Sequence, residues 1–298
     1  MRGSKSLSVA VRSPSGEIVT HLEPLDPRIY GGKMAKIPFL RGLTLLWDAL
    51  GLGVKSLMFS AEVAMEDEKE EDSGNAFQGP AQWGTVALSL AFSVAIFFLL
   101  PAFLADLLTR LLGLESAEFL RNVIEGTIRL VLLIGYISVI ALMPDIKRLY
   151  GYHGAEHKTI NAYEAGAELT PASVARFPLE HPRCGTAFLL TVVVISILFF
   201  SLLPPMTLPV RLLSRIVFLP VVAGIAYEFI RFTSRHQDKA IIRAITRPNL
   251  ALQHLTTREP DESMLAVAIT AFEQVLASEM GMEPAPDQAR LVEVPVAD

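Results

Sequence analysis

The sequence predicts an all-α polytopic membrane protein with about four transmembrane helices, an interfacial amphipathic helix and a small N-terminal β-hairpin. Hydrophobic residues make up 51% of the 298 positions and charged residues only 19%, whereas soluble domains carry about 25% charged residues. Four segments approach the ~20 apolar residues that cross ~30 Å of hydrocarbon. Apolar and polar residues alternate only near the N-terminus. The lipid bilayer is therefore the expected partner, and the net charge of −5 argues against nucleic-acid binding.

The first 36 residues are expected to form a cytoplasmic hairpin region. Leu7, Val9 and Val11 alternate with polar residues before the turn-forming stretch "SPSGE". A second alternating run follows that stretch, which is the pattern of two short antiparallel strands.

Residues 37–60 differ from the four span candidates because Arg41, Asp48 and Lys55 recur at seven-residue intervals. That spacing places all three charges on one helical face. The segment is predicted to be an amphipathic helix at the membrane surface, packing of its polar stripe against protein being the alternative. Residues 61–85, which include "EDEKEED", are expected to be an acidic linker.

Residues 86–230 are predicted to be a four-span membrane domain, interrupted by a loop over 144–185. Glu125 and Arg129 lie one helical turn apart in the second span, where they can pair. Arg215 and Glu228 lie near the two ends of the fourth span and are expected to reach toward an interface. The expected spans are Val86–Leu107, Val123–Met143, Thr186–Leu203 and Leu212–Ile230, with possible kinks at Pro101 and Pro220.

Lysine and arginine set the expected orientation. They gather in the 144–185 loop, after residue 230 and in the first 55 residues, so these parts and both termini are predicted to face the cytoplasm. The expected location is the inner (plasma) membrane, crossed several times. Residues 231–280 are predicted to be a cytoplasmic helical region that includes an amphipathic helix over Glu262–Glu279, and residues 281–298 a disordered tail.

The stretch "YHGAEHKTINAYEAG", residues 152–166, contains two histidines and a glutamate that could form a metal site. It is predicted to be helical from Gly154 to Ala165, with Gly166 as the cap. His153 and His157 are four residues apart, so they share a helical face and can bind one divalent ion. "HGAEH" matches the inverted zinc-peptidase pattern H-x-x-E-H, in which Glu156 would act as the general base.

The stretch "HPRCGT" adds His181 and Cys184, the single cysteine of the chain. Two residues separate them, a spacing that suits a metal site. A set of histidine nitrogens and a sulfur favours zinc, with iron as the second choice. Four ligands, His153, His157, His181 and Cys184, would make the metal structural, whereas three would leave a position for water. A different reading makes the histidines an interfacial surface and Cys184 a buried small residue.

These stretches, together with "IPFLRG" and "LTTREPDESMLAVAITA", resemble the YqhQ-like bacterial membrane proteins, a family of unknown function numbered 1385. The resemblance extends from "MRGSKSLSVAVR" to about Glu279 and implies a metal-dependent enzyme. Members of that family usually begin with a "YGGQAVIEGVMMRG"-like segment, and this sequence opens at its last three residues.

Two functions are compatible with the pattern. The first is a metal-dependent membrane enzyme, hydrolase-like, acting at the cytoplasmic face. The second is a non-catalytic assembly or scaffold protein whose metal pins the 144–185 loop. No P-loop, G-x-S-x-G elbow or dinucleotide fingerprint occurs, so the common ATPase, serine-hydrolase and NAD-dependent classes are excluded. Substrate, protein partner and oligomeric state are left open.

Overall fold

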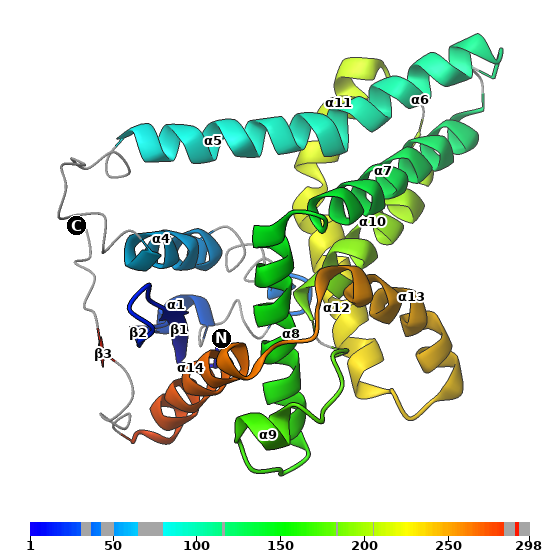
Figure 1. The fold of residues 1–298 in the computed structure, drawn as a ribbon. Coiled ribbons are helices and arrows are strands. Elements are labelled where there is room, and N and C mark those ends of the chain that lie inside the picture. Colours follow the sequence, from blue (N-terminus) through cyan, green and yellow to red (C-terminus); the bar gives the residue numbers. More distant parts are fainter. Residues whose placement is uncertain are drawn as a thin grey trace.

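The chain is described by a computed structural model that covers residues 1–30, 37–42, 51–64, 80–114, 117–182, 184–204, 206–282 and 290–291. It is mostly helical, as predicted, with a small sheet near the N-terminus. In Figure 1 the long helical rod of α5 (Pro80–Val94), η3 (Ala95–Leu99) and α6 (Leu100–Leu111) runs along the top. The sheet and α14 (Glu262–Met280) lie at the lower left, and α8 (Pro144–Glu164) stands upright to their right, near the centre. The first part of the chain contributes β1 (Ser6–Arg12), β2 (Ile18–Pro24), α1 (Pro27–Tyr30) and α4 (Gly53–Ala64).

The predicted hairpin is confirmed. β1 and β2 are antiparallel, with Val9 opposite His21, and their turn uses Gly16 at a φ of 92°. β3 (Arg290–Leu291) adds two residues in parallel to β2. These two residues belong to the tail predicted to be disordered, of which residues 283–289 and 292–298 lie outside the described part of the chain.

The helix predicted over residues 37–60 is only partly correct. Residues 37–42 form a turn, in which Phe39 has a φ of 67°, residues 43–50 lie outside the described part, and α4 continues to Ala64. Phe59 and Val63 of α4 pack on Val19 of the hairpin, while Lys55 forms an ion pair with Glu23 at 2.7 Å. The polar face of this segment therefore packs against protein rather than lying on a membrane surface, because its two described charges, Arg41 and Lys55, pair with Glu228 and Glu23.

Two described helices are long and apolar enough to cross a membrane, Gly84–Leu111 and Glu118–Ile140. A third candidate is a pair of helices bent by 46°, so the described residues give two or three spans rather than a clear four. The expected third span coincides with an apolar helix of only 17 residues. The helices of this part are α5 (Pro80–Val94), the π-helical turn η3 (Ala95–Leu99), α6 (Leu100–Leu111), α7 (Glu118–Ile140), α10 (Gly185–Ser201), α11 (Leu208–Val217) and α12 (Leu219–Arg235).

Proline acts differently in the two helices where a kink was expected. The break between α11 and α12 falls at Phe218, two residues before Pro220, because proline cannot donate the backbone bond that would continue the helix. Around Pro101 the chain stays within one long helical rod. A π-helical turn immediately precedes it, over Ala95–Leu99.

Charged side chains in these helices face one another instead of reaching toward an interface. Glu125 accepts hydrogen bonds from Arg129 at 2.8 Å and from Arg215 at 2.7 Å, and all three side chains are buried. The expectation that Arg215 reaches an interface is therefore wrong. Glu228 of α12 is paired with Arg41, which ties the N-terminal region to the last apolar helix.

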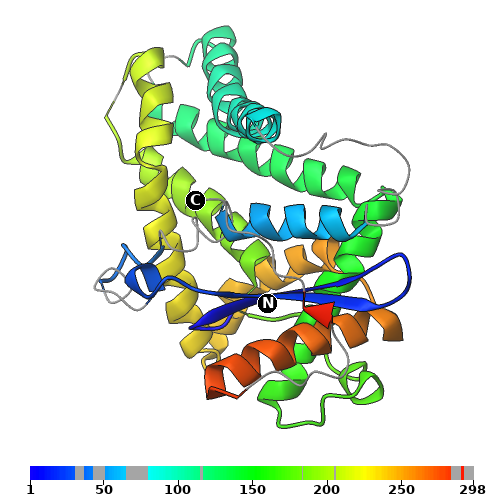
Figure 2. The same cartoon turned by 90° about the vertical axis from the view of Figure 1, so that its left-hand side faces the viewer.

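The remaining helices surround the histidine stretch. α14 packs against α8 and the hairpin, and its Leu265 and Ile269 form a core with Ala155 and Ala162 of α8. The predicted amphipathic helix over Glu262–Glu279 is thus confirmed. Figure 2 shows α14 beneath the sheet, on the opposite side of the molecule from the long rod. These helices are α8 (Pro144–Glu164), α9 (Pro171–Val174), α13 (Ala240–Thr256) and α14 (Glu262–Met280).

Candidate metal centre

Helix α8 presents the two histidines of the "HGAEH" motif. It starts with Pro144 at its first turn and Asp145 beside it, both favourable at a helix N-terminus. It ends before Gly166, whose φ of 70° confirms the predicted cap. The i, i+4 spacing puts His153 and His157 on one face, with their ring centroids 4.4 Å apart.

Backbone carbonyls fix the orientation of both imidazole rings. His153 Nδ1 lies 2.8 Å from the carbonyl oxygen of Thr256, and His157 Nδ1 lies 2.5 Å from that of Leu179. A carbonyl oxygen can only accept, so each Nδ1 carries the proton and donates it. Each Nε2 is then left for a different partner, which is the arrangement usual for histidines that bind metals.

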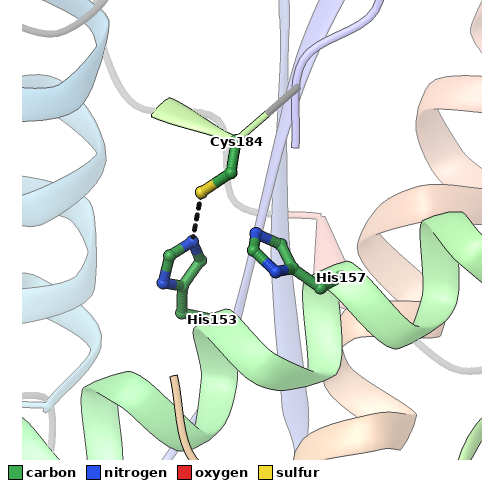
Figure 3. Close-up of side chains that lie close together, drawn as sticks. All are labelled: His153, His157 and Cys184. Atoms are coloured by element: carbon green, nitrogen blue, oxygen red, sulfur yellow. Dashed lines mark hydrogen bonds between the residues drawn. The ribbon is translucent and has the colours of Figure 1, made fainter. Parts of the chain in front are cut away.

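The second contributor is Cys184, which caps the N-terminus of α10. Its Sγ accepts a hydrogen bond from the Thr186 amide at 3.4 Å and lies 3.2 Å from Nε2 of His153 (Figure 3). The sulfur thus joins the histidines from a segment about 30 residues along the chain.

The charges of this group follow from its packing. Burial disfavours the thiolate, but hydrogen bonds with His153 and His157 outweigh it and lower the pKa of Cys184 to about 5. Burial likewise opposes charge on His153, yet its bond to Cys184 raises the pKa of that imidazole to about 9. Near neutral pH the metal-free group is therefore a thiolate paired with an imidazolium.

One ligand atom from each of His153, His157 and Cys184 lies within 4.8 Å of the other two. Tetrahedral zinc holds nitrogen at about 2.05 Å and sulfur at about 2.3 Å, so its ligand atoms are separated by roughly 3.3–3.8 Å. Small side-chain movements would bring the three atoms to that spacing. These three residues, which we call the HHC cluster, fit a zinc ion.

His181 lies beside the HHC cluster but outside it. Its ring centroid is 5.9 Å from that of His157, and its buried Nε2 makes no hydrogen bond within the described residues. Burial and then the nearby charge of His157 lower the pKa of His181, which favours a neutral ring. Glu164 is the closest acidic partner, with Oε2 at 3.7 Å from that Nε2. His181 is therefore placed as a neighbour that would need to move to become a fourth ligand.

Glu156 lies on α8 between the two histidines and is partly exposed. No hydrogen bond or ion pair joins its carboxylate to another described residue. Its negative charge adds a little to the raised pKa of His153 and partly opposes the lowering of the pKa of His181. The carboxylate is thus near the HHC cluster without being bound to it.

Side chains of α8 also hold the segment that leads to Cys184. Lys158 is buried and donates to the carbonyl oxygens of Ala175 and Phe177, at 2.8 and 2.9 Å. Asn161 donates to those of Pro178 and Glu180. This role could not be predicted from the sequence, although both residues lie in the same "HKTIN" run, because a polar residue gives no sign of which distant carbonyls it will bind.

Gln253 of α13 is a third positioning residue that was not predicted from the sequence. It is fully buried, accepts from the His181 amide at 2.9 Å and donates to the His181 carbonyl at 2.9 Å. The amide side chain therefore pairs with His181 as a neighbouring strand would, and fixes the backbone three residues before Cys184.

Glycine allows the close packing behind the cluster. A Cβ on Gly154 would lie 2.2 Å from the carbonyl oxygen of Arg258, and one on Gly151 would lie 2.6 Å from Sδ of Met264. Gly151 thus lets α8 approach α14, and Gly154 lets it approach the 256–258 segment closely enough for His153 to reach Thr256.

Comparison with known proteins gives a family but no activity. The family model described as "Protein of unknown function (DUF1385)" matches residues 37–278. The chain is 36% identical over 264 residues to "Uncharacterized protein YqhQ" of Bacillus subtilis (strain 168), which covers 85% of this chain and 82% of that protein. No solved structure matches.

Proposed function

The chain belongs to the DUF1385 family of proteins of unknown function, and from that premise we propose that it is a metal-dependent membrane enzyme. Its HHC cluster would hold a zinc ion, with iron as the second choice. The reaction class that suits this set is hydrolysis, because three protein ligands leave a fourth position for water.

The single observation that carries the proposal is the pair of carbonyl bonds made by the histidines. Both Nδ1 atoms are occupied by Thr256 and Leu179, so both rings are locked with Nε2 available. Cys184 supplies a sulfur that is ionised near neutral pH, as a metal ligand must be. An interfacial surface of histidines would not require locked rings or a buried thiolate.

In this proposal each residue has a distinct role. The metal ion would be bound by His153, His157 and Cys184. A zinc ion held there would lower the pKa of a bound water toward ~7. Glu156 would take the proton of that water as it attacks the substrate, and would return the proton to the leaving group. Its lack of other partners among the described residues leaves the carboxylate available for this role.

The site's place in the cell is part of the proposal. Apolar helices indicate that the protein is membrane-associated. We further propose that it crosses the inner membrane several times, with both termini and the HHC cluster facing the cytoplasm. The reason is that lysine and arginine gather in the segments that would lie on that side. Because Cys184, the single cysteine, is buried, a cysteine introduced at an exposed position, Lys147→Cys, should react with a membrane-impermeant maleimide in inverted vesicles but not in intact cells, with the wild type as the control. Labelling of intact cells alone would reverse the orientation.

The experiment for the enzyme uses Glu156→Gln in the zinc-loaded, detergent-solubilised protein. Activity would be screened on chromogenic esters, phosphate esters and peptides. We expect the variant to keep its metal and to lose activity by about 10²-fold or more, since it loses the general base. No hydrolysis by the wild type on any of these substrates, or equal rates in both proteins, would contradict the proposal.

A second candidate is a membrane scaffold with a structural metal, and the position of His181 favours it. Its buried Nε2, which makes no hydrogen bond within the described residues, is near enough to become a fourth ligand after a small movement, which would close the tetrahedron. A scaffold predicts that Cys184→Ala destabilises the protein whereas Glu156→Gln changes nothing measurable. X-ray absorption of the zinc-loaded protein separates the two: three protein ligands plus oxygen supports the enzyme, and four protein ligands supports the scaffold.

A further inference from the structure

A cavity of about 720 Å³ lies directly beside the HHC cluster, and Cys184 forms part of its wall. Sites for small molecules have volumes of about 300–1,000 Å³. The cavity is bounded by the end of α8, the start of α10 and the second half of α12. A molecule bound in it would therefore meet the cluster at its sulfur.

One wall of the cavity is apolar. Phe188 of α10 and Tyr227 and Ile230 of α12 line it, and the same three side chains pack together over Ala223 and Ala226. α10 is mostly apolar and has no charged residue, and α12 belongs to the bent pair that is a candidate span. A hydrocarbon chain that lies on such a wall is stabilised in proportion to the apolar area that the contact removes from water.

The other wall carries positive charge. Arg231 and Arg235 both line the cavity, and the i, i+4 spacing puts them on one face of α12. Neither guanidinium group makes a hydrogen bond or an ion pair with another residue in the described part of the chain, although the positive charge of Arg231 also attracts the carboxylate of Glu228. Glu164 is the one carboxylate in the lining, and it faces His181 at 3.7 Å. Two guanidinium groups are thus available to an anion from outside.

We propose that the cavity binds an anionic amphiphile, a lipid with a phosphate headgroup, and that this is the substrate class of the enzyme. This inference rests on the proposed function for its catalytic part. The phosphate lies between Arg231 and Arg235, which bind such groups with paired charge-assisted hydrogen bonds. The chain lies along Phe188, Tyr227 and Ile230, and the bonds near the headgroup face the HHC cluster.

The test measures binding to the full-length protein in non-ionic detergent by calorimetry. The probes are dioctanoyl phosphatidic acid, dioctanoyl phosphatidylcholine, dibutyryl phosphatidic acid and inorganic phosphate. We expect the first to bind most tightly, by roughly tenfold over each of the others, because it alone offers both the free anion and the long chain. Equal binding of the two dioctanoyl lipids overturns the role of the arginines, and equal binding of inorganic phosphate overturns the amphiphile.

Variants locate the site. Arg231→Ala/Arg235→Ala should weaken phosphatidic acid binding by roughly tenfold or more, since each lost bond to a charged group contributes substantially. The matched control, Lys147→Ala/Arg148→Ala, removes two exposed positive charges of α8 that do not line the cavity, and should leave binding unchanged. An equal loss in both double variants would mean attraction by net charge alone and would overturn the proposal.

A third variant separates this inference from the proposed function. His153→Ala/His157→Ala removes metal ligands but leaves Arg231, Arg235 and the apolar wall in place. Retained lipid binding in this variant supports the cavity as the lipid site, even if the wild type contains no metal and the enzyme proposal fails. Loss of lipid binding in this variant, with normal folding, would overturn the assignment of the headgroup to the arginines.

Discussion

At the scale of single residues, the protonation of the two imidazoles decides what the cluster can do. Each ring gives its Nδ1 proton to a backbone carbonyl, at Thr256 and Leu179, so the ring cannot turn without losing that bond. The remaining nitrogens converge near the sulfur of Cys184. Locked ligands are the condition for a site that keeps its geometry when a metal enters or leaves.

Gly154 offers the sharpest residue-scale test of that locking. Gly154→Ala would place a Cβ 2.2 Å from the Arg258 carbonyl, and the 256–258 segment would have to move away from His153. We expect the free energy of unfolding to fall by about 1–3 kcal/mol and zinc affinity to fall with it. Thermal unfolding in detergent and zinc titration measure the two effects.

The control is Gly135→Ala in α7, because a Cβ on Gly135 would meet no atom within 4 Å. The change should raise stability by up to about 1 kcal/mol, because alanine has a higher helix propensity than glycine. If Gly154→Ala is no more destabilising than this control, the close approach of α8 does not hold His153 in place.

The sequence predicts one half of the cluster and only part of the other. His153 and His157 share a face through local helical spacing, and that relation needs no knowledge of the rest of the fold. The structure brings Cys184 to the two histidines, whereas His181 lies outside the group of three. The choice between them depends on how residues 175–181 are held by Lys158, Asn161 and Gln253, which are long-range contacts that no local pattern reports.

At the scale of elements, α7 and α11 are joined by a buried ion network. Glu125 accepts from Arg129 on its own helix and from both Nε and Nη2 of Arg215. Periodicity predicts the local Glu125–Arg129 pair. It does not predict Arg215, because residues 90 positions apart meet only through the packing of the two helices.

Glu125→Gln tests how much this ion network contributes to the free energy of unfolding. The variant leaves two buried guanidinium groups facing each other without the carboxylate, and we expect a loss of about 3–5 kcal/mol in stability. Glu168→Gln, the same change at an exposed position after α8, should stay within about 0.5 kcal/mol. Thermal unfolding of both variants in the same detergent makes the comparison, and equal midpoints would show that the network contributes nothing.

Apolar length predicts spans only where a helix is straight. Gly84–Leu111 and Glu118–Ile140 were predicted to within a few residues and are long enough. The expected fourth span is two helices, since Phe218 ends α11 before Pro220. The expected third is a helix of 17 residues, a length at which composition alone does not separate a span from a buried helix.

At the scale of the whole molecule, the cluster stands where the apolar helices meet the polar part. The long rod of α5 to α6 lies on one side and the sheet with α14 on the other, as both views show (Figures 1 and 2). α8 packs on α14, while Cys184 begins the apolar helix α10 and Thr256 ends α13. A site at this boundary between apolar and polar parts suits a substrate that has both a hydrocarbon chain and a polar headgroup.

The central claim is that the HHC cluster holds a metal ion. The most direct test is elemental mass spectrometry of the detergent-solubilised protein, purified without chelators or a metal-binding tag. Three proteins are compared: the wild type, His153→Ala/His157→Ala, and the control His236→Ala, whose ring bonds only to Phe232 of its own helix among the described residues. We predict about one equivalent of zinc or iron in the wild type and the control, and none in the double variant. A wild type without metal would contradict the account.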